Sequence, residues 1–408
     1  LTAEGFEGRY GHYEAIDYTP DRLSRGKSCA IVRSFMAHHQ GMSFLSLSYL
    51  LLDQPMQARF LSDPQFQATM LLLHEKIPRA VAFYSDGSEY ETIDIIRSNA
   101  PQTSIRIFNT AATPLPDVNL LSNGRYHVML TNAGGSSSRW KDFAVTRWHE
   151  DSTRDHWGAF CYVRDVASDD FWSTTFQPTL KVPDYYEVIF SEGRAEFHRR
   201  DGDFDMHTEI VVSSEDDIEV RRSRITNLSG KSHTIEITSY AEVVLAPTAA
   251  DAAHPAFSNL FVQTEILYQH KAILCTRRAR SFEEQPPWMF HQMAVHGAII
   301  NQVSYETDRM RFIGRGQTVA APHAMLHHAP LSGTHGSVLD PVVAIRTRIM
   351  LAPEQTVTID IITGASDNRA DCAAMVDKYE DSNLTGRAFE LAGTHAQVIL
   401  RQLNATEA

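Results

Sequence analysis

A tyrosine-rich run near the start of the chain contains the side chains best suited to chemistry. It spans residues 8–19 and holds three tyrosines, two carboxylates and a histidine: Tyr10, His12, Tyr13, Glu14, Asp17 and Tyr18. A second run, residues 33–42, adds two histidines and an amide. Aromatic rings beside charged and amide groups suit a cleft that processes sugars, because the apolar face of a pyranose stacks on a ring while its hydroxyl groups form hydrogen bonds. The two runs therefore predict a substrate-binding wall made of Tyr10, Tyr13, His38, His39 and Gln40.

The carboxylates of Glu14 and Asp17 stand three residues apart, so on a helix they would share one face. Glycosidases use such a pair, with one carboxyl as acid/base and, in retaining enzymes, the other as nucleophile. The spacing also fits a structural alternative, in which both carboxylates lie at a helix start and complement its dipole. The flanking tyrosines favour the catalytic interpretation, which makes Glu14 and Asp17 the candidate catalytic residues.

The sequence predicts neither a metal site nor a cofactor. His38 and His39 are adjacent, so they point in different directions on a helix, and no histidine or acidic residue completes a ligand set at the usual spacing. We expect them to line a cleft as polar residues. The glycine pairs, such as Asn123-Gly124, match neither a G-x-G-x-x-G motif nor a P-loop, so nucleotide binding has no support.

Tryptophan alternates with arginine and acidic residues in three segments that end at Trp140, Trp148 and Trp157. Because tryptophan is unfavourable on a bare surface, these rings either pack in the core or between domains, or they form a platform for sugars. Core packing is the more common outcome. The platform alternative makes Arg139, Trp140 and Trp148 candidate substrate-binding residues.

The composition excludes several classes of function. The chain has 408 residues, 43% of them hydrophobic, which suffices for two or three globular domains. Its formal charge of −13 provides no basic field for a nucleic-acid partner. The four cysteines stand singly, which favours a reducing compartment over a disulfide scaffold. The most apolar run, residues 42–52, is too short to span a bilayer, so we expect a buried helix there and a soluble chain without a transmembrane segment.

The order of patterns along the chain predicts an α+β multidomain protein. Residues 1–82 read as helices: one capped by Thr19 and starting at Pro20, one from about Ser28 to the His38-His39 corner, one over 42–52 and one over 65–76. Prolines mark 83–118 as an extended linker. Alternating residues and glycine turns predict a large antiparallel β-sandwich over 119–366, and helices return over 367–408. Because the chain opens on Leu1 and ends in a helical region, we expect a fragment of a longer protein.

Two groups of motifs resemble a known family. GHYEAIDYT (11–19) and RSFMAHHQGM (33–42) resemble the end of the glycoamylase-like domain in bacterial cyclic β-1,2-glucan synthases. The remainder is similar to the β-supersandwich that opens the family 94 glycoside phosphorylase region of those enzymes. The supporting motifs are LLSNGRY (120–126), SRWKD (138–142), VTRW (145–148), SYAEVVLAP (239–247), DAAHPAFSNLFVQTE (251–265) and FIGRG (312–316).

This resemblance implies a role for each part of the chain. Residues 1–82 would be the last helices of an (α/α) barrel, 119–366 a carbohydrate-binding supersandwich, and 367–408 a helical linker toward a catalytic barrel. The whole protein would be a membrane-embedded synthase with its soluble parts in the cytoplasm. It would rearrange β-1,2-glucan by retaining transglycosylation and trim it with inorganic phosphate as co-substrate. Glu14 would be one carboxyl of the retaining pair, with acid/base as its expected role and its partner upstream of Leu1.

Two functions stay open for the chain itself. As part of a glycosyltransferase and phosphorylase, it would contribute carbohydrate binding and part of a glucan cleft, without a complete active site. Alternatively, it is a non-catalytic carbohydrate-binding, scaffold or dimerisation module of another family 94 glycoside phosphorylase. The expected partners are a β-glucan, the remaining domains of the same polypeptide and, as one option, a second copy of the chain.

Overall fold

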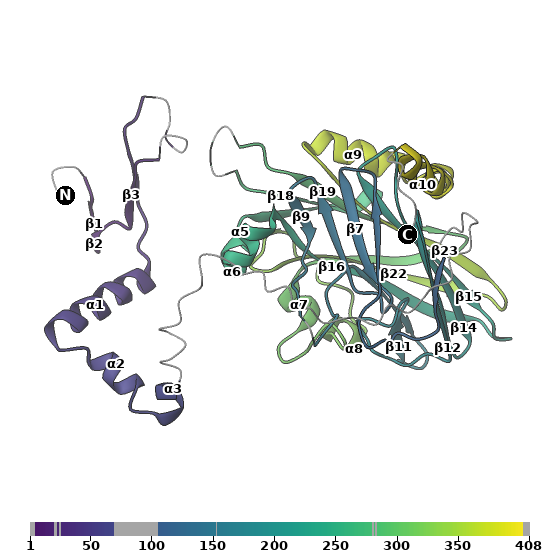
Figure 1. The fold of residues 1–408 in the computed structure, drawn as a ribbon, viewed down its shortest axis with the longest axis horizontal. Coiled ribbons are helices and arrows are strands. Elements are labelled where there is room, and N and C mark those ends of the chain that lie inside the picture. Colours follow the sequence, from purple (N-terminus) through teal and green to yellow (C-terminus); the bar gives the residue numbers. More distant parts are fainter. Residues whose placement is uncertain are drawn as a thin grey trace, which may run out of the picture. The chain divides into compact units, whose positions relative to one another are not determined.

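The computed structural model describes residues 5–19, 23, 26–68, 105–151, 153–279, 281 and 284–402. They fall into two compact units. The first comprises the described residues up to 100 together with residue 281, and the second comprises the others. Figure 1 shows the first unit as small strands and helices, and the second as a large body of strands. Each unit is described by itself.

The first unit begins with two short antiparallel hairpins and not with helices. Strands β1 (Glu7–Gly8) and β2 (Gly11–His12) form one hairpin, and β3 (Ala15–Asp17) pairs with β4 (Ala30–Val32) in the other. The helix predicted from about Ser28 is therefore wrong at its start. Ile31 and Val32 are β-branched and favour a strand once a partner is available. The predicted helix start at Pro20 lies outside the described residues.

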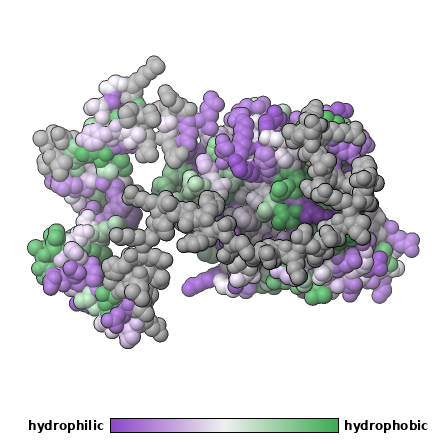
Figure 2. Space-filling model, in the orientation of Figure 1, coloured by the Kyte–Doolittle hydropathy of each residue, from purple (hydrophilic) through white to green (hydrophobic). Residues whose placement is uncertain are grey.

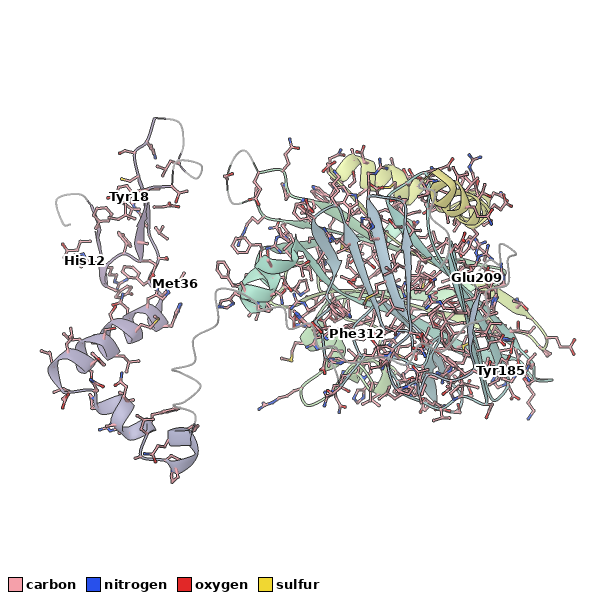
Figure 3. The ribbon with its side chains drawn as sticks, viewed as in Figure 1. His12, Tyr18, Met36, Tyr185, Glu209 and Phe312 are labelled. Carbon is pink, nitrogen blue, oxygen red and sulfur yellow. The ribbon has the colours of Figure 1, made fainter. Side chains whose placement is uncertain are left out.

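Three helices follow in the first unit: α1 (Ala37–Leu51), α2 (Pro55–Phe60) and α3 (Pro64–Ala68). The helix predicted over 42–52 is confirmed, but it begins earlier, at Ala37. His38 and His39 therefore lie in the first turn of α1 and not at a corner. Met36, the N-cap of α1, is labelled in Figure 3. The prediction that this helix is buried is not met within the described residues. Apolar side chains such as Phe44 and Leu50 are 72% and 77% exposed, and Figure 2 shows hydrophobic surface on this unit.

The second unit is a sandwich of two antiparallel sheets, which confirms the predicted fold class. Within the described residues, one sheet has nine strands in the order β11-β10-β16-β9-β8-β7-β6, with β22 beside β16 and β20 beside β22. These strands are β6 (Val118–Ser122), β7 (Tyr126–Thr131), β8 (Ser136–Trp140), β9 (Phe143–Thr146), β10 (Phe160–Asp165), β11 (Phe171–Ser173), β16 (His233–Pro247), β20 (Ile300–Asp308) and β22 (Pro341–Leu351).

The facing sheet has ten strands in the order β21-β17-β18-β19-β23-β15-β14-β13-β12-β5. They are β5 (Arg106–Phe108), β12 (Tyr185–Ser191), β13 (Arg194–Asp201), β14 (Phe204–Val212), β15 (Ile218–Asn227), β17 (Val262–Leu267), β18 (Ala272–Arg277), β19 (Trp288–His296), β21 (Gly336–Ser337) and β23 (Thr356–Ser366). Side chains from both sheets, among them Phe197 and Ile237, form one continuous apolar core. Burial alternates along β12, as a strand with one face on the core requires.

The described end of the range predicted as a linker belongs to the sandwich. Strand β5 pairs with β12 at the edge of the ten-stranded sheet, with Ile107 opposite Ile189. The Arg106 guanidinium also donates to the Val118 carbonyl oxygen at 2.8 Å. The sequence gives no sign of this pairing, because the two strands are about 80 residues apart along the chain. The remainder of the predicted linker, residues 83–104, lies outside the described residues.

Helices pack on the outer faces of the sandwich. Helices α7 (Arg309–Ile313) and α8 (His323–Leu326) pack on the nine-stranded sheet through Phe312, which Figure 3 labels. The predicted C-terminal helices are present as α9 (Arg369–Lys378) and α10 (Ser382–Gln402). They share a second apolar cluster with the ten-stranded sheet, so they are packed onto the sandwich (Figure 1). The other short helices are α5 (Thr248–Ala253), α6 (Pro255–Asn259) and η3 (Tyr268–His270).

No helix in the described part of the chain combines the length and the apolar character needed to cross a bilayer.

Candidate functional site

The structure brings the two predicted runs of the first unit together at Glu14. This residue lies in the bend before β3, and its backbone N–H donates to the Ser34 carbonyl oxygen at 3.1 Å. Its Oε1 contacts Nδ1 of His39 in the first turn of α1. The Glu14 carboxylate is only 10% exposed, whereas the His39 ring is 47% exposed. The pairing of strands and the start of α1 therefore position a mostly buried carboxylate beside an accessible imidazole.

The second oxygen of Glu14 forms no hydrogen bond. Its Oε2 is buried and has no hydrogen-bond partner, and the hydroxyl of Ser34 is also buried and unpartnered. A buried polar atom without a partner costs about 1–3 kcal/mol, so such an atom is usually explained by function or by a missing ligand. A carboxyl held through one oxygen and free at the other can donate or accept a proton there.

An aromatic cluster is formed by residues that neighbour Glu14 and Ser34 in the sequence. The rings of Tyr10 and Tyr13 pack against Phe35, with centroids 5.6 Å and 5.2 Å away. The close approach depends on Gly8, where an added Cβ would collide with the rings of Tyr13 and Phe35. Tyr10 remains 73% exposed and can stack on a ligand. Phe35 is absent from the predicted site, although it stands within the second run that was singled out.

The premise for pairing Glu14 with Asp17 is wrong, because this segment is a strand and not a helix. In an extended chain, residues three apart point to opposite faces. Asp17 ends β3, and its Oδ1 accepts the backbone N–H of Thr19 at 2.8 Å. A catalytic role for either carboxylate stays a prediction, now without the argument from a shared helical face.

The other predicted residues of the first unit are exposed at the start of α1. His38 and Gln40 lie on either side of His39 in the helix, and the two imidazole rings stand 4.1 Å apart. Among the described residues, no group of three or more histidine, cysteine or acidic side chains could hold a metal ion. The exposed positions are open to a ligand, and substrate binding by them stays a prediction.

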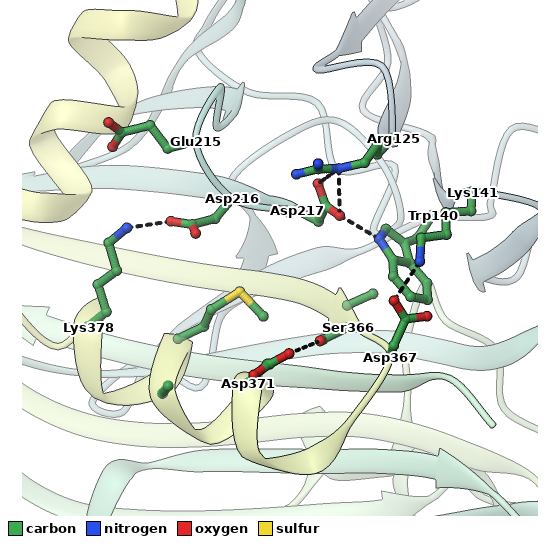
Figure 4. Close-up of a pocket in the computed structure, with 13 residues that line it drawn as sticks. Arg125, Trp140, Lys141, Glu215, Asp216, Asp217, Ser366, Asp367, Asp371 and Lys378 are labelled. Carbon is green, nitrogen blue, oxygen red and sulfur yellow. Dashed lines mark hydrogen bonds and ion pairs between the residues drawn. The ribbon is translucent and has the colours of Figure 1, made fainter. Parts of the chain in front are cut away.

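In the second unit, Trp140 is a core residue. It is 2% exposed, and its indole N–H donates to Asp217 Oδ2 at 2.8 Å (Figure 4). The Lys141 ammonium lies 4.1 Å from the ring centroid and covers one face. Arg139 is exposed and donates to the Lys141 carbonyl oxygen at 2.8 Å, while Trp148 is half-buried just after β9. Core packing, one of the two alternatives for the tryptophans, thus describes Trp140, and contact of these three residues with substrate stays a prediction.

The cavity beside Trp140 is lined with charged residues that pair with one another. Figure 4 shows Asp216, Asp217, Asp367 and Asp371 facing basic or polar groups. The pairs are Asp217 with Arg125, Asp216 with Lys378, Asp367 with Lys141, Asp371 with Ser366, and Glu215 with Arg387. Since these carboxylates already have partners, the cavity is a structural seam between the sandwich and α9.

Another cavity of the sandwich is lined by Trp157, which the sequence singled out but did not assign to a site. The cavity has a volume of about 480 Å³ and lies at the outer face of the nine-stranded sheet near α7. Its polar lining comes from segments far apart in sequence, including Arg147, Glu242 and Arg309, and also contains His156 and Gln177. Only the interleaving of tryptophan with arginine and acid could have indicated this place.

Two packed antiparallel sheets of this size define a β-supersandwich. The chain belongs to the family described as glycosyl hydrolase 94, supersandwich domain, whose family model matches residues 101–382. The resemblance seen in the sequence is thereby confirmed for the second unit.

Comparison with known proteins extends this result to the first unit. The chain is 34% identical over 406 residues to the cyclic beta-(1,2)-glucan synthase NdvB of Rhizobium meliloti (strain 1021), a match that covers 100% of this chain and 14% of that protein. Solabiose phosphorylase of Paenibacillus borealis is 23% identical over 64% of this chain and 33% of its own length. N,N'-diacetylchitobiose phosphorylase of Vibrio furnissii is 23% identical over 68% of this chain and 34% of its own length. The chain thus spans at most about a third of these relatives. Among solved structures, a bacterial glucoamylase complexed with acarbose aligns over 72% of this chain and 40% of its own, with 10% identity and a TM-score of 0.39.

Proposed function

We propose that the protein containing this chain is a synthase that acts on β-1,2-glucan. One observation carries the proposal: the likeness to the cyclic glucan synthase extends over the whole chain, whereas the likeness to two phosphorylases covers 64% and 68% of it. The first unit, which holds Glu14, lies before the region matched by the family 94 model. A phosphorylase with the supersandwich alone would not account for that unit.

The first unit would contribute one catalytic carboxyl. A retaining transglycosylase needs an acid/base and a nucleophile on either side of the glycosidic bond. Glu14 suits the acid/base role, because His39 orients one oxygen and the other oxygen is unpartnered. The exposed Tyr10 would stack on a glucose unit, and His38 and Gln40 would bond to its hydroxyl groups. Asp17 is the less favoured candidate, because its carboxylate already accepts a backbone N–H.

The second unit would position glucan for its neighbouring domains. The proposal includes inorganic phosphate as a co-substrate and no cofactor, because trimming by phosphorolysis consumes phosphate directly. It also includes placement on the cytoplasmic side of the inner membrane, contacts with other domains of the same polypeptide, and a homodimer as one option. Membership of a carbohydrate-acting family supports the glucan as partner.

The proposal is tested by replacing Glu14 with Gln in the complete protein that contains this chain. The variant keeps the shape of the side chain but cannot transfer a proton, so we expect transglycosylation of linear β-1,2-glucan to fall by about 10²–10⁴-fold. Mass spectrometry of the glucan chain lengths measures the loss. Glu7→Gln is the matched control, since Glu7 is exposed on β1 in the same unit. Full activity in Glu14→Gln, or equal loss in the control, would contradict the assignment.

A further inference from the structure

The cavity beside Trp157 has the features of a binding site. Its volume of 480 Å³ lies within the range of small-molecule pockets, about 300–1,000 Å³. It is formed entirely within the second unit and shares no lining residue with the cavity beside Trp140. It therefore needs an explanation of its own.

Three buried polar atoms that form no hydrogen bond belong to residues lining this one cavity. They are Nε of Arg147, Nδ1 of His156 and Oε1 of Gln177. Arg147 and Gln177 are each only 7% exposed, so water does not readily replace the missing partners. An arginine N–H donates and an amide oxygen accepts, so the ligand that satisfies both must donate as well as accept hydrogen bonds. A hydroxyl group does both.

The aromatic wall of the cavity is held in place by the sandwich. The Trp157 carbonyl oxygen accepts the backbone N–H of Ser136 at 2.9 Å, and the Ser136 hydroxyl accepts the N–H of Ala159 at 3.1 Å. Gly158 permits this approach, because a Cβ there would collide with Ser136 and its φ of +156° is one that other residues rarely adopt. Trp157 is half-buried, so part of an anchored ring is available to an apolar ligand surface.

The cavity wall carries three arginines, Arg147, Arg154 and Arg309, and two carboxylates, Asp155 and Glu242, and most of these charges are paired with one another. Glu242 Oε1 accepts a hydrogen bond from Arg309 Nε at 2.6 Å, and Glu242 Oε2 forms an ion pair with Arg147 Nε at 3.7 Å. Arg147 also donates to Asp251 at 3.1 Å. Burial raises the pKa of Asp155, whose carboxylate accepts from Thr131, so its negative charge is held less readily than usual. Because Arg147 and Arg309 are already paired with carboxylates, the wall favours a neutral ligand over an anion such as phosphate.

We propose that this cavity binds a glucose unit of a glucan chain, with the sugar's apolar face on Trp157 and its hydroxyl groups bonded to Arg147, His156 and Gln177. The sugar satisfies the three unpartnered atoms and matches the aromatic wall at once. Its identity as a β-1,2-glucan rests on the proposed function, whereas the saccharide chemistry rests on the cavity alone. The supersandwich thereby holds glucan at a place separate from Glu14.

The test measures binding of two probes to the full 408-residue chain by isothermal titration calorimetry: a β-1,2-linked and a β-1,4-linked gluco-oligosaccharide. We expect the β-1,2-linked probe to bind. Trp157→Leu should weaken its binding about tenfold or more, since an aromatic anchor is lost. Gln177→Met should weaken it about fivefold, the equivalent of one hydrogen bond. Gln292→Met is the matched control, because Gln292 is a buried glutamine with an unpartnered Oε1 outside this cavity. Thermal melting of each variant verifies that it is folded.

Each outcome separates the cavity from the proposed function. Binding of only the β-1,4-linked probe, lost in Trp157→Leu, supports a saccharide cavity but contradicts the β-1,2-glucan assignment. If the β-1,2-linked probe binds equally well to folded Trp157→Leu and Gln177→Met, the assignment of the cavity as its binding site is wrong. The proposed function is not affected by that result. If neither probe binds, the assignment of the cavity as a saccharide site is wrong. The same conclusion follows if inorganic phosphate binds there in their place.

Discussion

His291 and Ser239 join the two sheets of the sandwich through a hydrogen bond of 2.8 Å between Nε2 and Oγ. His291 belongs to β19 in the ten-stranded sheet and Ser239 to β16 in the facing sheet. The other ring nitrogen of His291 lies 2.9 Å from the Thr363 hydroxyl, and the residue is 1% exposed. Burial, aided by the charge of Arg221, lowers the pKa of His291 to about 3. The imidazole is therefore neutral in the folded protein.

The neutral histidine makes stability depend on pH. In the unfolded chain His291 binds a proton below its ordinary pKa of about 6.5, while in the fold it stays neutral down to about pH 3. Its contribution is complete above pH 6.5 and is lost as the pH falls toward 3. From this group the free energy of unfolding should drop by about 2 kcal/mol between pH 7 and pH 5. Urea unfolding at both pH values measures the drop.

A substitution isolates this effect from other titrating groups. In His291→Gln, the difference in the free energy of unfolding between pH 7 and pH 5 should be smaller than in the parent chain by about that amount. His335→Gln, at an exposed site, should leave the difference unchanged. An identical pH dependence in His291→Gln and the parent chain would show that the histidine is not the titrating group.

Glu236 is expected to be among the most sensitive positions in the sandwich. It is buried among the guanidinium groups of Arg164, Arg346 and Arg348, which overcome the effect of burial and hold its pKa below the usual range. Glu236→Gln leaves those cations without their carboxylate, so we expect a loss of about 3–5 kcal/mol in the free energy of unfolding. Denaturant unfolding tests this, with the exposed Glu390→Gln as control. A loss equal to that of the control would refute the prediction.

The same carboxylate has a defined pH dependence. Because the pKa of Glu236 is lower in the fold than in the unfolded chain, its stabilising effect is present above about pH 4.5 and is lost as the pH falls further. The parent chain should therefore lose stability below pH 4.5 more steeply than Glu236→Gln does. Parallel slopes for the two chains in that range would argue against a lowered pKa.

Truncation of Trp140 should lower the stability of the sandwich, because the ring is part of its core. Trp140→Ala removes a ring that is 2% exposed and leaves Asp217 without the indole N–H. We expect the free energy of unfolding to fall by about 3–5 kcal/mol. Arg139→Ala, at the exposed neighbour, should change it by about 0.5 kcal/mol or less. A Trp140→Ala protein as stable as the parent chain would show that the ring is a surface platform after all.

The cysteines should differ sharply in reactivity. Burial raises the pKa of Cys161 to about 12 and of Cys372 to about 12, and raises that of Cys275 as well. Cys29 is half-buried in the first unit. Since the thiolate is the reactive form, iodoacetamide should modify Cys29 in the native chain and the other three only after unfolding. Peptide mass spectrometry reads the labelling, and equal labelling of all four in the native chain would be inconsistent with the packed sandwich.

Patterns that repeat over a few residues could be read from the sequence. The hairpin of β12 and β13 follows from such patterns, because the alternation of side chains and a glycine turn are local properties. The two motifs that hold Glu14 and His39 also lie together in the fold, since the two side chains are in contact. By contrast, the segments that begin at Ala15 and Ala30 lie in a range with a helical pattern but form strands. Each strand is specified by pairing with the other and not by its own few residues.

The sequence by itself determined the antiparallel sandwich and the helices that follow it along the chain, because these follow from side-chain periodicity and residue type. Only the tertiary structure decided which tryptophan is enclosed and which lines a cavity. Trp140 and Trp157 have similar arginine-rich surroundings in the sequence. Their burial differs because Asp217 and Lys141 enclose the first, while the segments that surround the second leave a hollow. Such contacts join residues distant along the chain, and no local pattern encodes them.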